Sequence, residues 1–186
     1  MRFSPPETGA CARLGLERRE ALWQVAALQS GLLAGAGSRE PSPLRKMNAL
    51  ERTLADYRGT GLTTGPHLMS HLRAELHRRN VLAARDLKKI PDGHWVRTAG
   101  VVIVRQRPMT AKGFLFMTLE DETGTSNAVV TPDLFQKNRA LLQTAGLLLV
   151  EGPLQSQDGV IHVRGRRFHR LDLNPADTLP PSRDFH

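Results

Sequence analysis

The chain has 186 residues and a formal net charge of +8, with 26 Lys and Arg against 18 Asp and Glu. This length allows one compact domain with appendages but excludes two large ones. A basic balance favours a polyanionic partner, and the single cysteine, Cys11, excludes an internal disulfide. The longest apolar run, at 147–150, is too short to span a bilayer, and the N-terminal MRFSPPETGA lacks the apolar core of a signal peptide. We therefore predict a cytoplasmic protein that does not associate with membranes.

The first half of the chain contains short stretches with helical spacing. Segment 15–27, GLERREALWQVAA, predicts one amphipathic helix, so residues 1–30 are expected to form a short helical remnant. Segment 31–46 is rich in Gly, Ser and Pro and predicts a flexible linker. Segment 47–91 predicts further helices at ALERTLADY, PHLMSHLRAELHRR and LAARDLKKI, separated by glycines and a Gly-Pro pair.

From Trp95 the spacing of apolar residues becomes that of β-strands. VRTAGVVIVRQR, FLFMTLED and SNAVVT predict three strands, and Gly100 indicates a bulge or sharp bend in the first. Thr131-Pro132 begins a predicted helix over DLFQKNRALLQT. AGLLLVEGPLQ and VIHVRGRRFHRL then predict a fourth and a fifth strand around the turn SQDG.

The predicted order is therefore β-β-β-α-β-β over residues 92–173. A five-stranded barrel with a helix between its third and fourth strands is the arrangement of the OB-fold, which binds oligonucleotides and oligosaccharides. The whole chain is then mainly β with a helical N-terminal part. The tail, residues 174–186, is predicted to be disordered.

The stretch 96–139, VRTAGVVIVRQRPMTAKGFLFMTLEDETGTSNAVVTPDLFQKNR, is similar to the C-terminal OB-fold of bacterial error-prone DNA polymerases, of the C-family alpha-subunit type. That family has a V-R-Q-R-P segment, T-A-K-G, a T-L-E-D-E-T-G turn and a strand leading into P-D-L-F. The similarity continues through VEGPLQSQDGVIHVRGRRFHRL, and DYRGTGLTTGPHLMSHLR resembles the helical segment before this domain. The resemblance implies a role in DNA replication and repair, by translesion synthesis after DNA damage.

The resemblance also implies that the chain is not itself an enzyme. In this family the catalytic carboxylates and the metallohydrolase-like domain lie hundreds of residues upstream. Nucleotidyl transfer needs carboxylates that hold two divalent ions, whereas the acids of LEDET lie at a strand end and turn, where we expect them to fix the hairpin. His67 and His71 form H-x-x-x-H, but Leu68 replaces the glutamate of a zinc protease. We predict no catalytic residue, no metal and no cofactor.

The second predicted strand has aromatic residues on one face. Alternation places Leu115, Met117 and Leu119 towards the barrel interior and Phe114 and Phe116 outside, where OB-folds meet their ligands. Stacking of a base on an aromatic side chain contributes about 1–3 kcal/mol and tolerates any sequence. The alternative is that both phenylalanines pack under the upstream helices.

Basic residues surround these aromatics in the predicted barrel. Two arginine pairs each share a strand face, a lysine lies in the adjoining turn, and few acids in these strands balance them, which favours contacts with phosphates over a solvated face. An asparagine on the third strand is placed to bind a base edge or to serve a structural role. The predicted nucleic-acid contacts are Arg105, Arg107, Lys112, Phe114, Phe116, Asn127, Arg164 and Arg166.

Three functions remain open from the sequence. The first is an OB-fold that holds single-stranded DNA for a polymerase. The second is an interaction module that docks a translesion-synthesis partner or another polymerase subunit. The third is an RNA-binding domain, because Phe116, Leu119 and Asp121 resemble the F-x-x-L-x-D spacing of anticodon-binding OB domains in class II tRNA synthetases.

Overall fold

The computed structural model describes residues 18–29, 43–60, 63, 65–157, 159–171 and 183–185. They fall into two compact units, Met1–Gly65 and Pro66–His186. Most of the predicted linker and of the predicted tail lies outside the described residues. The boundary between the units falls inside the helical segment predicted at 47–91. No helix among the described residues is long and apolar enough to cross a membrane.

Unit Met1–Gly65 contains two of the helices predicted from spacing, α1 (Arg18–Gln29) and α2 (Ala49–Thr60). Asn48 begins α2 with a reciprocal capping box. The Asn48 Oδ1 accepts from the Glu51 N–H at 2.8 Å, and the Glu51 Oε2 accepts from the Asn48 N–H at 2.8 Å. These bonds satisfy amides that the first turn of a helix leaves without partners. The bond from Asn48 also lowers the pKa of Glu51.

Unit Pro66–His186 contains the remaining helices and all the strands of the described residues. Its helical elements are α3 (Leu68–Arg78), α4 (Ala84–Leu87), the 3-10 turn η3 (Met109–Ala111), α5 (Pro132–Lys137) and α6 (Arg139–Thr144). Its strands are β1 (Trp95–Gln106), β2 (Leu115–Asp121), β3 (Gly124–Val130), β4 (Leu147–Gln157), β5 (Val160–Arg164), β6 (Arg167–Arg170) and β7 (Arg183–Phe185).

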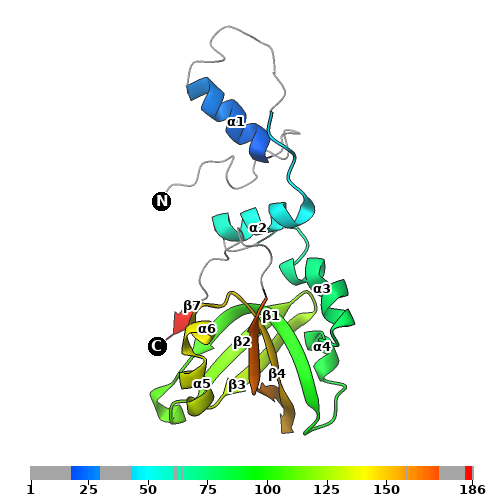
Figure 1. Ribbon diagram of the computed structural model, residues 1–186, viewed down its shortest axis with the longest axis vertical. Coiled ribbons are helices and arrows are strands. Elements are labelled where there is room, and N and C mark those ends of the chain that lie inside the picture. Colours follow the sequence, from blue (N-terminus) through cyan, green and yellow to red (C-terminus); the bar gives the residue numbers. More distant parts are fainter. Residues whose placement is uncertain are drawn as a thin grey trace. The chain divides into compact units, whose positions relative to one another are not determined.

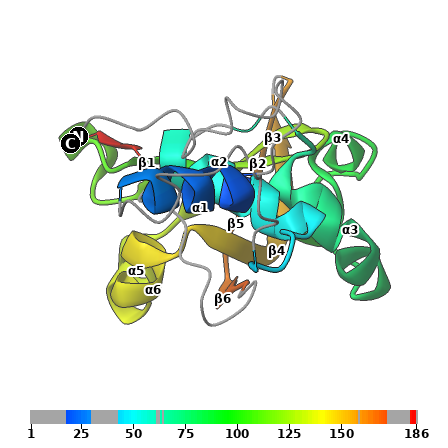
Figure 2. The ribbon, with the colours of Figure 1, turned by 90° about the horizontal axis from the view of Figure 1, so that it is seen from above.

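Five of these strands close into a barrel in the order β1-β2-β3-β5-β4-β1 (Figure 1). The β3–β5 pair is parallel, and the other pairs of the ring are antiparallel. The helices α5 and α6 lie between β3 and β4 in the chain. This ring and its helix position are those of the OB-fold, so the predicted fold class is confirmed. Figure 2 shows α3 and α4 on one side of the barrel and α5 and α6 on the other.

Three predicted elements differ in detail from the observed ones. The fifth predicted strand is divided into β5 and β6, and β6 pairs with β4. The predicted helix over DLFQKNRALLQT is divided at Asn138. Within the tail predicted to be disordered, Arg183–Phe185 forms β7, which pairs in parallel with β1.

The barrel interior is filled by aliphatic side chains that alternate along the strands. In β2 the buried residues are Leu115, Met117 and Leu119, as the alternation predicts. Phe135 of α5 and Leu142 of α6 belong to the same core cluster. The two short helices therefore contribute their apolar sides to the core of the barrel.

A β-bulge in β1 changes which side chains face the core. Val102 pairs with Leu119 and Val104 pairs with Thr118, so Ile103 has no opposite residue in β2. Gly100 lies just before the bulge, and a Cβ there would be 2.6 Å from the Glu120 carbonyl oxygen. An extra residue moves all following side chains to the opposite face of the strand.

Candidate nucleic-acid interface

Three aligned side chains cross the outer face of β2, β3 and β5. Phe116 pairs with Val129, and Val129 pairs with Arg164. Directly paired residues point to the same face of a sheet, and their chain neighbours Leu115, Ala128 and Val163 are buried in the core. Phe116 is 39 % exposed. An aromatic ring, an aliphatic side chain and a guanidinium thus form one outward row, hereafter the outer row (Phe116, Val129 and Arg164).

A polar pair follows the outer row along the hairpin. Thr118 pairs with Asn127, and the Thr118 hydroxyl donates to the Asn127 Oδ1 at 3.2 Å. This bond uses the amide oxygen and leaves the two hydrogens of the Asn127 amide for another acceptor. The geometry is compatible with both predicted roles of Asn127, a structural contact and a contact with a base edge.

The loop between β1 and β2 carries two of the predicted phosphate contacts at the side of the hairpin. The Arg107 guanidinium lies 4.5 Å from the centroid of the Phe135 ring and its Nε donates to the Gly113 carbonyl at 3.3 Å. Lys112 is exposed and has φ of +48°, followed by Gly113 with φ of +83°. Consecutive left-handed residues make the tight return into β2, and glycine adopts this conformation without steric cost. Both cations are therefore held near the start of β2.

Phe114 does not share the strand face that the sequence predicted for it. It lies before the first residue of β2, and its N–H donates to the Ala111 carbonyl at 3.0 Å. Phe114 is half-buried within the loop. Phe116 is consequently the one phenylalanine of this pair that lies in the outer row.

Arg105 corrects the predicted set of phosphate contacts. It is 7 % exposed, pairs with the buried Met117, and donates from its Nε to the Leu142 carbonyl at 2.7 Å and from its Nη2 to the Ala145 carbonyl. These carbonyls lie at the C-terminal end of α6, where a cation also meets the negative end of the helix dipole. The bulge at Ile103 turns Arg105 inward, so Arg105 does not belong to the candidate interface.

Arg164 and Arg166 lie where the chain passes from β5 towards β6. Arg164 is half-buried, and a Cβ at Gly152 would collide with its carbonyl oxygen. Arg166 is exposed, and its N–H donates to the Glu151 carbonyl at 2.8 Å. The backbone is thus fixed closely against β4, with the Arg166 side chain directed to solvent. Contact of these side chains with phosphates stays a prediction.

The acidic residues at the other end of the hairpin are used within the protein. Asp121 is buried and accepts from the Arg73 Nη2 at 2.9 Å, the Ala84 N–H at 2.8 Å and the Thr123 N–H at 2.7 Å. Glu122 also pairs with Arg73. These bonds tie α3 and α4 to the β2–β3 turn, as the predicted role of LEDET in fixing the hairpin requires. Within the described part of the chain, no group of three His, Cys, Asp or Glu side chains could hold a metal ion.

Sequence reasoning missed Val129 as a member of the outer row. The signal was present in the turn, because a two-residue connection between Asp121 and Gly124 fixes the register of the whole hairpin. Counting back from that turn pairs Phe116 with Val129. The pairing of β3 with β5 has no comparable local signal, since these strands are far apart in the sequence.

Comparison with solved structures finds matches at low similarity. Asparaginyl-tRNA synthetase from Pyrococcus horikoshii has a TM-score of 0.42 and 21% identity, over 49% of this chain and 22% of that protein. The Stn1–Ten1 complex of S. pombe has a TM-score of 0.35 and 20% identity, over 45% of this chain and 61% of the matched chain. The fold assignment rests on the closed strand ring described above.

Comparison with curated proteins finds error-prone DNA polymerases. The polymerase of Caulobacter vibrioides is 44% identical over an alignment of 174 positions, which covers 89% of this chain and 16% of the relative. Error-prone DNA polymerase 1 of Rhizobium meliloti is 44% identical over 181 residues, 91% of this chain and 16% of the relative. The polymerase of Xanthomonas oryzae pv. oryzae strain PXO99A is 39% identical over an alignment of 187 positions, which covers 100% of this chain and 17% of the relative.

No family model matches the chain, and the chain spans about one sixth of the length of these curated relatives. The aligned regions cover 89%, 91% and 100% of its residues. They agree with the resemblance that the T-A-K-G and E-D-E-T-G motifs predict, which is thereby confirmed. This chain is a homologue of one part of the error-prone DNA polymerases.

Proposed function

We propose that the OB barrel binds single-stranded DNA, without base preference, as part of an error-prone DNA polymerase. The observation that carries this proposal is the outer row, in which Phe116 and Arg164 lie on either side of Val129. An exposed ring offers a stacking surface to any base, and a nearby guanidinium offers a phosphate contact. The β2–β3 face is also where OB-folds hold oligonucleotides.

The distribution of charge around the outer row supports the same ligand. Arg107 and Lys112 lie at the β1–β2 loop, and Arg164 and Arg166 lie at the end of β5. The acids of the hairpin, in contrast, are at its far end and Asp121 and Glu122 are paired with Arg73. A DNA strand that contacts these cations would cross the β2–β3 hairpin without passing the acids at its turn.

The proposal assigns binding to this chain and leaves nucleotidyl transfer to other parts of a longer polymerase. Asp121 and Glu122 already hold Arg73 and the hairpin turn, so these acids are engaged in structural contacts. The chain would then act in the cytoplasm, where bacterial DNA lies. Other polymerase or translesion-synthesis subunits are further proposed partners.

Fluorescence anisotropy of a labelled oligo-dT, titrated with the full chain over a salt series, tests this function. Four contacts, from Arg107, Lys112, Arg164 and Arg166, would each contribute a log–log slope of about −0.7, giving about −3 in total. The same titration with oligo-rU separates DNA from RNA. We expect the chain to bind oligo-dT at least as tightly as oligo-rU.

Two variants with matched controls separate the contributions. Phe116→Ala should weaken binding by about 1–3 kcal/mol through lost stacking. Leu22→Ala is its control, because Leu22 is 37 % exposed and Phe116 is 39 % exposed. Arg164→Gln should reduce the salt slope by roughly one contact, and Arg78→Gln removes an exposed arginine of α3 as its control.

Absence of binding even at low salt would rule out a DNA-binding barrel. The outer row would then be a docking surface for a protein partner. A clear preference for oligo-rU would instead favour the anticodon-type alternative. Equal losses in Phe116→Ala and Leu22→Ala would remove the stacking role of Phe116 while leaving the electrostatic part of the proposal intact.

A further inference from the structure

A second exposed aromatic residue lies away from the β2–β3 hairpin. Trp95 begins β1, pairs with Pro153 of β4 and is 53 % exposed. The Arg167 guanidinium lies 6.0 Å from the centroid of its ring. A large aromatic ring with an arginine beside it, and more than half of its surface open, has the components of a base-stacking site.

The segment Arg164–Gly165–Arg166–Arg167, which we call the arginine strap, connects the outer row with Trp95. The Gly165 N–H donates to the Val129 carbonyl of β3 at 2.9 Å, and the next N–H, of Arg166, donates to the Glu151 carbonyl of β4 at 2.8 Å. The chain therefore passes from one edge of the hairpin face to β4 within two residues. Arg164 belongs to the outer row, and Arg167 lies at Trp95.

Two glycines hold the arginine strap against the barrel. A Cβ at Gly152 would collide with the Arg164 carbonyl, and a Cβ at Gly165 would lie 2.6 Å from the Phe168 ring. Because the backbone is so close to β4, the arginine side chains have no room beneath the strap. Arg166 and Arg167 are exposed accordingly.

The arginines of the strap form no ion pair with another described residue. Glu151, the buried carboxylate of β4, is paired with Arg97 at 3.3 Å and with His169 at 3.4 Å. None of the described acids lies within ion-pair distance of Arg164, Arg166 or Arg167. Arginines that have no described acidic partner, placed between two aromatic rings, suit a phosphate backbone with bases on both sides.

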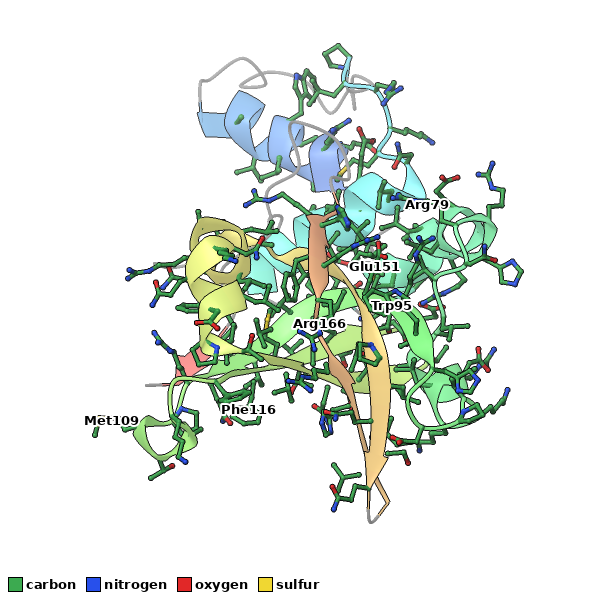
Figure 3. The ribbon with its side chains drawn as sticks, turned by 60° about the horizontal axis from the view of Figure 1, so that its bottom comes forward. Arg79, Trp95, Met109, Phe116, Glu151 and Arg166 are labelled. Atoms are coloured by element: carbon green, nitrogen blue, oxygen red, sulfur yellow. The ribbon has the colours of Figure 1, made fainter. Side chains whose placement is uncertain are left out.

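Phe116 and Trp95 are connected by a row of neighbouring residues that crosses the strands of the barrel. Phe116, Val129 and Arg164 are in register on β2, β3 and β5, and Gly152 of β4, against which Arg164 lies, pairs with Val96 next to Trp95. Four strand spacings of about 4.8 Å give roughly 19 Å. At a rise of about 3.4 Å per nucleotide this distance corresponds to about six stacked nucleotides. In Figure 3, Arg166 lies between Phe116 and Trp95.

We propose that a single DNA strand longer than about six nucleotides runs from Phe116 over the arginine strap and stacks a base on Trp95. This inference rests on the proposed function and extends its site beyond the hairpin face. It predicts a binding site whose second half is reached only by longer oligonucleotides. The strap contributes phosphate contacts between the two stacking positions.

The test is a length series of oligo-dT, from three to fifteen nucleotides, bound to the full chain and to Trp95→Ala. We expect the substitution to weaken binding of the fifteen-nucleotide strand about fivefold or more, and of strands of three or four nucleotides less than twofold. Trp95→Phe, which keeps a ring, should restore most of the affinity. Arg167→Gln should weaken binding of the long strand only, with Arg78→Gln as the matched loss of charge, and thermal melts would verify that each variant is folded.

Tryptophan fluorescence provides an independent readout. In a Trp23→Phe background, Trp95 is the remaining tryptophan of the two in the chain. Long strands should quench its emission, whereas the shortest strands should leave it unchanged.

The outcomes separate this inference from the proposed function. If short and long strands bind and Trp95→Ala weakens neither, or weakens both equally, the second site is overturned while the proposed function stands. If no strand binds at any length, both are overturned. Quenching by the long strand, together with a length-dependent loss in Trp95→Ala, supports both.

Discussion

Arg105 and Arg107 are two positions apart in the sequence and have different surroundings in the structure. Arg105 donates to carbonyls at the end of α6, whereas Arg107 is exposed beside the Phe135 ring. The bulge at Ile103 sends Arg105 to the core side of β1. A buried cation at a helix C-terminus stabilises the fold, and an exposed one beside a ligand face is available for binding.

Replacing Arg105 should therefore affect stability and leave DNA binding unchanged. Arg105→Met keeps much of the side-chain volume but leaves the Leu142 and Ala145 carbonyls without their charged donor, which should lower the free energy of unfolding by about 1.5–3 kcal/mol. Urea unfolding measures this loss, and anisotropy with oligo-dT measures binding. Arg78→Met is the exposed control. Weakened binding by a fully stable Arg105→Met protein would return Arg105 to the interface.

At the scale of elements, α3 begins with a histidine cap, His67, and protonation of this histidine should destabilise the fold. The His67 Nδ1 accepts from the Met69 N–H at 3.1 Å and so caps α3. Burial lowers the pKa of His67, and the attraction of Glu120, whose Oε2 lies 3.9 Å from the Nε2, only partly opposes this effect. Glu122, Asp121 and Arg73 also face this ring.

Acid should therefore weaken the fold through His67. Its folded-state pKa lies below the unfolded value of 6.5, so the unfolded chain binds more protons and stability rises with pH in this range. The contribution of neutral His67 to the free energy of unfolding is complete above pH of about 6.5. It is lost as the pH falls from there towards the folded-state pKa. A protonated Nδ1 also ceases to accept from Met69.

His67→Asn isolates this effect, because Asn is a good N-cap and does not titrate. Urea unfolding at pH 7 and pH 5 should give a smaller acid-induced loss of unfolding free energy in the variant than in the wild type. The variant should be nearly as stable as the wild type at pH 7. Parallel pH dependences for the two proteins would show that His67 is not the group responsible.

Strand alternation was sufficient to predict some elements and insufficient for others. The inner and outer faces of β2 follow from FLFMTLED because polar residues mark one face. In VVIV of β1 every residue is apolar, so nothing in the pattern locates the bulge at Ile103, and the inward position of Arg105 was missed for that reason. The division of the last strand at Gly165 depends on close packing against Phe168, a contact made only in the folded barrel.

At the scale of the whole molecule, the barrel core and the proposed binding residues belong to one of the two compact units. All members of the barrel core cluster, from Leu87 to Phe168, belong to unit Pro66–His186. The outer row and the arginine strap belong to the same unit. The sequence predicted the barrel at 92–173, but α3 and α4 also belong to its unit, because Arg73 and the Ala84 N–H both bond to Asp121.

A shortened chain of residues 66–186 should consequently fold and bind alone. Its apolar core is complete, and folding is cooperative within such a unit. We expect a single calorimetric transition, and an affinity for a fifteen-nucleotide oligo-dT equal to that of the full chain. A shortened chain of residues 92–186 is the informative comparison, because it keeps β7 but loses Arg73 and Ala84, which leaves the Asp121 carboxylate with fewer partners. It should be less stable by about 3 kcal/mol or more. Equal stability of the two shortened chains would mean that α3 and α4 contribute little to the fold, and a loss of affinity in 66–186 would place part of the binding surface within residues 1–65.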